Sequence, residues 1–521
     1  MIQHAEALAQ RLEGVIARRQ IWLLALWTVA LFGVGISASR ARPFWFDEIF
    51  TWEIARPGAA AGVMEQLRQQ IDQHPPVFFW ITRLGFAFTG NEHVAARLPA
   101  MFGVWLMGVC LFRFVQRRGG ALLGAFAIGV VLNTIVVRYL VEARPYGLVL
   151  GFSALALLSW QAAAMPHRGF WPLAGITLGI AGAISSSYYG AMVAAPLICA
   201  ELVRAALRRR GNLPAVDFPV WIAVVLGGSA AAPWMPLVLG SVRGFAGRNF
   251  ATPHLSSYSY ASQEMLIPVI PLMIGAVILI GFYTATAPAP APGDIRRQPR
   301  FSPPEMTAVV GFALIPLLAL IVALLWINRF ASRYVLEGVL GVAILIAVAV
   351  WTAVRGSALV GLFLILIAAG TAAGNGFRIL YRDAPYGPSL AAVSAEMVSG
   401  EPADLPIAMD EPLTCLEMMH YGRREFARRL VFIVDQPLQS EYAAVPYEGE
   451  TWLTMARVWG DVRAERLRAF VREHPRFLLL NSSSPFTYLL PVLLAHGADM
   501  RLIAAHGGLS LYAVSVAPGA F

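Results

Sequence analysis

Residues 43–76 read PFWFDEIFTWEIARPGAAAGVMEQLRQQIDQHPP, with the acidic pair Asp47-Glu48 near the start and Asp72-Gln73-His74 just before the final two prolines. Long apolar runs lie on both sides of this segment. Charged groups are costly to bury in lipid, so several of them gathered beside a bilayer need a reason to be there. The segment is therefore the first candidate for a functional site.

The composition indicates a membrane protein. The chain is 58% hydrophobic and only 14% charged, whereas soluble domains carry about 25% charged residues. The formal charge of +9 comes from arginine, because the chain has no lysine. No nucleic-acid-binding motif accompanies that charge, so we expect no nucleic-acid partner. The scattered cysteines Cys110, Cys199 and Cys415 form neither a disulfide framework nor a zinc site.

Apolar runs predict about eleven membrane spans, because a helix needs about 20 residues to cross the hydrocarbon core. The runs lie near residues 21–38, 97–115, 121–137, 147–164, 171–187, 189–204, 218–239, 266–284, 306–327, 335–353 and 357–374. Residues 75–89 are apolar too, but the segment is short and contains Arg83. We therefore expect a juxtamembrane helix there, inside an outer loop at residues 39–96.

Loop charges predict the orientation. Arginines such as Arg117, Arg118 and those at 208–210 fall on one side of the predicted membrane, which the positive-inside rule assigns to the cytoplasm. The first apolar run has no clear cleavage site, so we expect a retained helix with a cytoplasmic N-terminus. An odd number of spans then leaves the C-terminal part outside. The Ala-Pro-rich stretch 285–304 is typical of a disordered cytoplasmic linker.

The composition changes near residue 376, where acidic residues reappear and apolar runs become short. Strands are predicted at 405–410, 429–435 and 476–481, with a final hairpin at 502–516. The expected fold is mainly α: a polytopic membrane helical bundle at 1–375, followed by a small extracytoplasmic α/β domain at 376–521. The second domain has no catalytic constellation, so binding an acceptor or a partner suits it better than chemistry.

Asp47 and Glu48 are the candidate catalytic residues. Transfer of a sugar to a hydroxyl or amine needs a carboxylate that takes the acceptor proton as the nucleophile attacks the anomeric carbon. The aromatic residues around the pair can lie in the headgroup layer or stack on a sugar. The alternative interpretation is an interfacial aromatic belt with solvated acids.

Asp72 and His74 form the second candidate group. An aspartate and a histidine two residues apart can bind a divalent cation or position an acceptor hydroxyl, although such a pair alone is weak evidence for a metal. A divalent cation is therefore the one cofactor to consider. The alternative is a helix start with Asp72 as a cap and His74 on the surface.

Arginines in loops predicted to face outward form the third group, because short translocated loops normally avoid arginine. They suit the phosphate of a lipid carrier, whose oxygens match the guanidinium fork. The alternatives are lipid headgroups or pairing with Glu142, Glu264 or Glu337. The arginines are Arg138, Arg144, Arg243, Arg248, Arg329 and Arg333.

Four motifs occur in a characteristic order. They are Asp47-Glu48, Asp72-x-His74-Pro75-Pro76, Arg97-Leu98-Pro99 and Glu142-Ala143-Arg144-Pro145-Tyr146. In this order the chain resembles the GT-C superfamily of polytopic glycosyltransferases. It is most similar to bacterial members of the protein O-mannosyltransferase and lipid A aminoarabinose transferase group (glycosyltransferase family 39-like). The similarity is strongest over residues 44–158 and negligible in the C-terminal domain.

The resemblance implies a polyprenyl-phosphate-linked sugar donor, an inverting reaction and a bacterial inner membrane location. Asp47 matches the acid implicated in catalysis in that group, with Glu48 beside it. Asp72 and His74 match an element near the acceptor and a metal site. The aminoarabinose branch has its second acid where this chain has Gln73, which argues against a metal at Asp72 and against that branch. Arg333-Tyr334 resembles the Arg-Tyr pair that opens a late helix in many members, which implies a donor-phosphate contact. Tyr146 joins the outer arginines in the predicted donor-phosphate group.

The leading hypothesis is therefore a glycosyltransferase acting on an extracytoplasmic glycolipid, polysaccharide or protein, with Asp47 as general base. A transporter or flippase of lipid-linked sugars is the competing hypothesis. Against it, the acids lie in an extramembrane loop, and no paired broken helices suggest inverted repeats. A receptor or assembly scaffold built around the C-terminal domain is the third.

Overall fold

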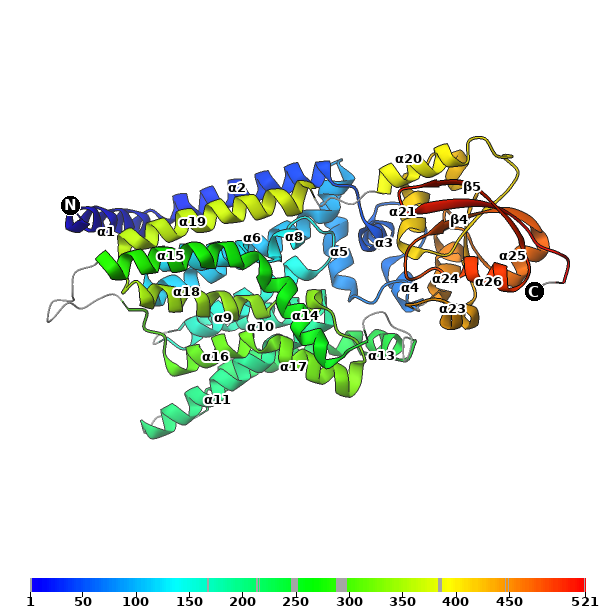
Figure 1. Cartoon of the computed structure of the whole chain (residues 1–521). Coiled ribbons are helices and arrows are strands. Elements are labelled where there is room, and N and C mark those ends of the chain that lie inside the picture. Colours follow the sequence, from blue (N-terminus) through cyan, green and yellow to red (C-terminus); the bar gives the residue numbers. More distant parts are fainter. Residues whose placement is uncertain are drawn as a thin grey trace.

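The computed structural model describes residues 2–165, 168–211, 214, 216–244, 252–286, 298–382, 387–445, 447, 449–519 and 521. Figure 1 shows a bundle of long helices with an α/β domain at one end and the N-terminus at the opposite end. Most of the predicted linker at 285–304 lies outside the described residues.

Within the described residues, seven helical segments are long and apolar enough to cross a membrane. They are α2 (Gln20–Ala41), α6 (Glu92–Gly119), α9 (Tyr146–Ala163), η1 with α11 (Tyr188–Val193, Ala194–Arg210), α12 with η2 and the start of α13 (Phe218–Ser229, Ala232–Trp234, Met235–Gly244), α14 with η3 and α15 (Leu255–Leu266, Ile267–Val269, Ile270–Thr286), and a segment beginning with α19 (Ala358–Phe377). The expectation of a polytopic, mainly helical protein is confirmed.

An eighth candidate span is broken, and three further apolar helices are shorter. The pieces Pro303–Ala313 and Ile315–Ile327 meet at 52° and contain α16 (Pro303–Ala313), α17 (Ile315–Val322) and the π-helical turn η4 (Ala323–Ile327). The shorter helices are α7 (Ala121–Leu132), α10 (Phe170–Ser186) and α18 (Gly338–Ala353). Every predicted span therefore coincides with an apolar helix, but among the described residues only seven segments, or eight with the broken pair, are long enough to cross a membrane, against the eleven predicted.

Close packing of α6 on α9 fixes the two helix ends that carry site residues. A Cβ atom at Gly103 of α6 would lie 2.1 Å from the carbonyl oxygen of Gly147, and one at Gly151 would lie 2.5 Å from that of Gly103. Small residues at such a crossing let two backbones approach closely. The short elements that join the spans are α1 (Ile2–Arg18), α8 (Val136–Tyr139), η5 (Ser332–Val335) and η6 (Arg378–Arg382).

The loop at residues 39–96, called the outer loop after its predicted side of the membrane, folds into three short helices, α3 (Phe46–Ala55), α4 (Val63–Arg68) and α5 (Pro76–Gly85). Asp47 and Glu48 lie in the first turn of α3, where carboxylates interact favourably with the helix dipole. Pro76 is the first residue of α5, a position that suits proline because its missing N–H would lack a helical partner anyway. The predicted juxtamembrane helix is α5.

The C-terminal domain contains a sheet with strand order β3-β2-β1-β4-β6-β5. The first four strands run parallel, and β6 pairs antiparallel with β4 and β5. The strands are β1 (Ile407–Met409), β2 (Leu430–Val434), β3 (Ala464–Arg466), β4 (Arg476–Ser482), β5 (Asp499–His506) and β6 (Leu509–Ser515). Five of them match predicted strands. The sequence did not predict β3, because it is only three residues long and has no buried side chain.

Helices cover both faces of this sheet. Ile407 and Met409 of β1 point into one apolar cluster, and Ala408 between them points into another, as the alternation of a strand requires. The first face carries α20 (Gly387–Met397), α21 (Pro412–Tyr421) and α24 (Glu450–Trp459), and the second carries α23 (Gln436–Tyr442), α25 (Leu467–Glu473) and α26 (Leu489–Ala495). The short α22 (Arg424–Ala427) follows α21.

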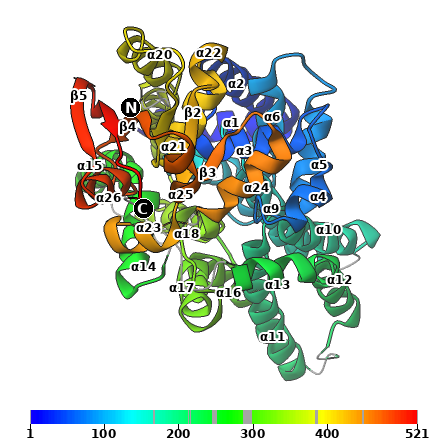
Figure 2. The ribbon, with the colours of Figure 1, turned by 90° about the vertical axis from the view of Figure 1, so that its right-hand side faces the viewer.

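The outer loop and the first face of the sheet share one hydrophobic core. That cluster joins Phe44, Ile49, Phe50 and Phe78 of the loop region to Leu416 and other residues of the C-terminal domain. Figure 2, which looks onto this end of the molecule, shows α21 and α24 beside α3. The C-terminal domain is thus docked on the loop that carries the acidic pair.

Candidate active site

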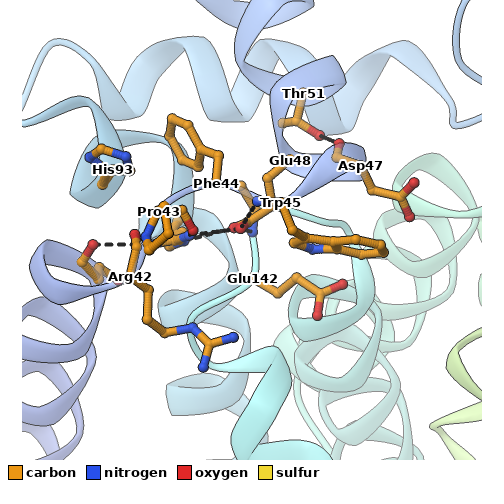
Figure 3. A network of polar contacts seen from close by, with 12 residues as sticks. Arg42, Pro43, Phe44, Trp45, Asp47, Glu48, Thr51, His93 and Glu142 are labelled. Atoms are coloured by element: carbon orange, nitrogen blue, oxygen red, sulfur yellow. Dashed lines mark hydrogen bonds and ion pairs between the residues drawn. The ribbon is translucent and has the colours of Figure 1, made fainter. Parts of the chain in front are cut away.

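The two adjacent acids of α3 have different surroundings. Figure 3 shows the side chains of Asp47 and Glu48 leaving the first turn of the helix in different directions. The Asp47 side chain is 17% exposed and lines a cavity. The carboxylate of Glu48 is almost completely buried and does not line that cavity. The cavity therefore receives one of the two acids.

Glu48 is bound by Arg97 of α6. The Nε and Nη2 atoms of Arg97 each lie 2.7 Å from an oxygen of the Glu48 carboxylate. The same guanidinium donates to the carbonyl oxygens of Ser39, Arg42 and Pro43 at 2.9–3.0 Å. Because Arg97 is fully buried, removing either partner leaves an unpaired buried charge, which costs about 3–5 kcal/mol. The pair fixes the chain that enters α3.

Asp72, His74 and Arg144 form a second buried cluster. Arg144 Nη1 lies 2.8 Å from Asp72 Oδ2 and 3.1 Å from the carbonyl oxygen of Asp47. Burial by itself raises the pKa of Asp72, but the charges and hydrogen bonds of Arg144 and His74 hold it well below its ordinary value. Burial, and then the Arg144 charge, lower the pKa of His74. At neutral pH the cluster therefore contains a carboxylate, a guanidinium and a neutral imidazole.

The contacts of His74 indicate its tautomer. The Nδ1 atom lies 2.7 Å from Asp72 Oδ1 and 2.9 Å from Arg144 Nη2. An arginine nitrogen can only donate, so a neutral ring pairs with one of these neighbours and not both. We assign the proton to Nδ1, because its contact with the carboxylate is the shorter. The Nε2 atom is then the acceptor nitrogen of a residue that lines the cavity.

The Asp72 and His74 pair does not fit a metal ion well. Both carboxylate oxygens of Asp72 are already engaged, one by Arg144 and one by His74. Within the described part of the chain, no group of three or more His, Cys, Asp or Glu side chains is arranged to hold a cation. Arg144 supplies the positive charge at the position where a metal would have bound Asp72.

Two adjoining cavities meet at these residues. The larger, of about 330 Å³, lies between the helical bundle and the C-terminal domain, and the smaller, of about 130 Å³, lies on the side of η1. The residues that line both are Gln73, His74, Arg329 and Tyr334. The larger cavity also receives Asp47, Asp72, Arg144 and Arg333. The structure thus brings together residues from four distant parts of the sequence.

Arg333 and Asp47 form an ion pair in the wall of the larger cavity. The Nη1 atom of Arg333 lies 3.4 Å from Asp47 Oδ2, and its buried Nε has no hydrogen-bond partner among the described residues. The turn that carries Arg329 and Arg333 follows Asn328, which ends a helix in the left-handed conformation with φ 52°. Asparagine adopts that conformation more readily than most residues. Tyr334, which follows Arg333 in this turn, stacks on Tyr189 with a centroid separation of 4.9 Å.

Several residues that the sequence assigned to donor-phosphate binding do not line either cavity in the described structure. Arg138 does not line either cavity, and its Nε lies 3.3 Å from Glu142 Oε2, which is the pairing considered as the alternative. Tyr146 is buried and lines neither cavity, and its ring lies roughly perpendicular to that of His74 with centroids 6.0 Å apart. Arg248 and the side chain of Arg243 lie outside the described residues.

The wall contributed by the C-terminal domain was not predicted. The side chains that line the larger cavity from this side follow strands β1, β2 and β4: Pro412, Leu413, Tyr447, Thr451, Trp452, Met455 and Phe486. Parallel α/β sheets bind ligands at the carboxyl ends of their strands. The positions after predicted strands were therefore the one sequence signal that could have indicated this wall. The tyrosines Tyr188 and Tyr189 of the smaller cavity carried no such signal.

Comparisons with known proteins agree with this architecture. A family model described as dolichyl-phosphate-mannose-protein mannosyltransferase matches residues 73–235. The crystal structure of ArnT from Cupriavidus metallidurans bound to undecaprenyl phosphate is similar over 95% of this chain and 98% of that one, with 14% identity and a TM-score of 0.53. The Archaeoglobus fulgidus oligosaccharyltransferase, in complex with Zn and sulfate, aligns over 88% of this chain and 67% of that one, with 12% identity and a TM-score of 0.44.

A search of the curated proteins found no match. The similarity to ArnT covers nearly the whole of both chains, including the C-terminal domain, where the sequence had suggested no likeness. The fold expected from the four motifs is confirmed. The chain is a polytopic membrane protein with the fold of the GT-C glycosyltransferase superfamily.

Proposed function

We propose that this protein is a membrane glycosyltransferase that moves a sugar from a polyprenyl-phosphate carrier to an extracytoplasmic acceptor, with inversion at the anomeric carbon. The observation that carries the proposal is the composition of the larger cavity. One partly exposed carboxylate, Asp47, faces Arg333, and Arg329 and Tyr334 lie at the junction with the smaller cavity. A base opposite a phosphate-binding group is what such a transfer needs.

In this proposal the donor phosphate binds Arg333, Arg329 and Tyr334. Guanidinium groups match phosphate oxygens and stabilise the charge that develops on the leaving phosphate. Arg333 lines the larger cavity, and its Nε has no hydrogen-bond partner among the described residues. The carrier chain extends past Tyr188, Tyr189 and Met192, which give the smaller cavity an aromatic and apolar wall. Bound undecaprenyl phosphate in the structurally similar ArnT supports this class of donor.

The chemical step is a single displacement. The acceptor oxygen or nitrogen forms a bond to the anomeric carbon as the bond from that carbon to the phosphate oxygen breaks. The bonding pair leaves with the polyprenyl phosphate, and the acceptor proton passes to the carboxylate of Asp47. Glu48 takes no part in proton transfer in this scheme, because Arg97 holds both of its oxygens. Arg144 holds Asp72, and Asp72 in turn holds His74, whose Nε2 can accept a hydrogen bond from an acceptor hydroxyl.

The acceptor enters from the side of the C-terminal domain. Leu413, Phe486 and Thr451 are the partly exposed side chains in that wall of the larger cavity. Such a surface suits a glycolipid, a polysaccharide or a protein segment carrying a hydroxyl or amine. We further propose that the protein lies in the bacterial inner membrane with its N-terminus in the cytoplasm and its C-terminal domain outside. A divalent cation is not needed at Asp72 in this scheme.

The decisive experiment uses purified full-length protein in detergent with a radiolabelled polyprenyl-phosphate sugar and an envelope extract as acceptor. Label should move to an acceptor in the wild type and not in Asp47→Asn. Detergent removes any sealed compartment, so a flippase without covalent chemistry would leave all label on the carrier. If all label stays on the carrier, the proposed transferase activity is wrong. If Asp47→Asn transfers label fully, Asp47 is not the base.

A further inference from the structure

Helix α21 of the C-terminal domain contacts the backbone just before Asp47. The Oε1 atom of Glu417 accepts a hydrogen bond from the N–H of Phe46 at 3.2 Å. One turn further on, the hydroxyl oxygen of Tyr421 accepts one from the N–H of Phe44. These are the amides one and three residues before the proposed base. The contacts cross between segments more than 370 positions apart in the sequence.

These amides need partners from outside their own segment. Phe46 is the first residue of α3, and the first N–H groups of a helix have no acceptor within the helix. A carboxylate at that end satisfies a donor and also interacts favourably with the helix dipole. Both contacts are sheltered, because Glu417 is 9% exposed and Phe44 is 1% exposed. Water is thus a poor substitute for either acceptor.

The segment is held from two sides. Arg97 of α6 binds the carbonyl oxygen of Pro43 and the carboxylate of Glu48, so the membrane helices fix its other face. The start of α21 supplies Pro412 and Leu413 to the cavity wall. One helix of the C-terminal domain therefore both lines the cavity and supports the loop that carries Asp47.

We propose that Glu417 and Tyr421 are positioning residues for Asp47, which makes the C-terminal domain a working part of the transferase. The inference rests on the proposed function, in which Asp47 is the base. Misplacing a reacting group by about 1 Å can cost about 100-fold in rate. The donor site at Arg333 belongs to a different segment and makes none of these contacts. Loss of the α21 contacts should therefore lower kcat and leave the donor KM unchanged.

The test compares Tyr421→Phe, Glu417→Ala and the double variant with Glu417→Gln, which keeps an acceptor oxygen. Glu425→Ala, on the exposed surface of α22, is the matched control. We expect kcat to fall roughly tenfold in each single variant and about 100-fold in the double variant. Glu417→Gln and Glu425→Ala should stay within about twofold of wild type. Hydrogen exchange should become faster at residues 44–48 and unchanged in the membrane helices.

Failure of the inference can be told from failure of the proposed function. If Asp47→Asn is inactive but the double variant keeps wild-type kcat, or if exchange at residues 44–48 is unchanged, Glu417 and Tyr421 do not position the base. A rise in donor KM with unchanged kcat would also overturn the inference. If Asp47→Asn transfers sugar normally, the inference falls together with the proposed function. Tyr421→Phe conserves side-chain volume, so it remains a test if Glu417→Ala fails to fold.

Discussion

Arg333 Nη1 lies 3.4 Å from Asp47 Oδ2, in the wall of a cavity that both residues line. The two belong to segments almost 290 positions apart. In the proposed reaction a donor phosphate competes with Asp47 for this guanidinium. Donor binding would then draw Arg333 away and leave the carboxylate free to accept a proton. The pairing thus links arrival of the donor to availability of the base.

Replacing Arg333 should weaken donor binding. Arg333→Ala removes a guanidinium from the proposed phosphate site, and hydrogen bonds to charged groups contribute about 1.5–3 kcal/mol. We expect the donor KM to rise at least about tenfold, with little change in the acceptor KM. Arg138→Ala is the control, because Arg138 pairs with Glu142 and lines neither cavity. An equal loss of donor affinity in both variants would contradict the assignment.

Substitution of Asp47 should lower activity without loss of stability, whereas substitution of Glu48 should lower stability. Asp47→Asn should reduce kcat by about 100-fold or more, since general bases contribute about 10²–10⁴, while thermal unfolding in detergent stays near that of wild type. Glu48→Gln breaks the buried pair with Arg97 and should lower the free energy of unfolding by about 3–5 kcal/mol. Thermal denaturation alongside single-turnover transfer separates the two effects. A stable, inactive Glu48→Gln variant would instead assign Glu48 to the chemistry.

His74 should make stability depend on pH. Burial and then Arg144 lower its folded pKa below 6.5, although Asp72 and Asp47 partly oppose this. Below pH 6.5 the unfolded chain therefore binds a proton that the folded chain does not. The free energy of unfolding falls as the pH decreases, by at most about 1.4 kcal/mol per pH unit. Burial raises the pKa values of Glu142 and Glu417 to about 7. For these two carboxyls the folded chain binds the proton more tightly, so they make the free energy of unfolding rise as the pH decreases.

The contribution of His74 is isolated by comparing melting temperatures of wild type and His74→Gln between pH 7.5 and 5. The difference between the two curves should change over this range because only the wild type carries the buried imidazole of His74. His506→Gln, at an exposed position in β5, is the control and should run parallel to wild type. Parallel curves for His74→Gln would mean that His74 is not held neutral.

Leu413 should affect the acceptor and not the donor. It is 37% exposed and lies in the wall that the C-terminal domain gives to the larger cavity. Leu413→Ser removes apolar contact area, and changes of this size alter binding by about 1–3 kcal/mol. We expect roughly a tenfold rise in acceptor KM with an unchanged donor KM. Leu494→Ser, an exposed leucine on the opposite face of the sheet, should change neither constant.

Much of the fold could be predicted because its signals are local. Apolar runs near 20 residues predicted the spans, and short apolar runs predicted β1, β2 and β4. Strand β3 was not found, because its three residues gain their structure only by pairing with β2. For the candidate site, the types of residue in the outer loop were enough to indicate Asp47, Asp72 and His74 as members.

The sequence by itself determined that this is a polytopic membrane protein with candidate acids gathered in the loop at residues 39–96, because hydropathy and residue type are properties of each segment alone. Only the tertiary structure decided which acid faces the cavity. Glu48 lies beside Asp47 in the chain, but a buried arginine 49 positions away binds its carboxylate. Likewise, only folding placed Arg144 on Asp72 and α21 against the start of α3. Ion pairs and hydrogen bonds depend on distances of about 3 Å, and such distances between remote segments are fixed by packing.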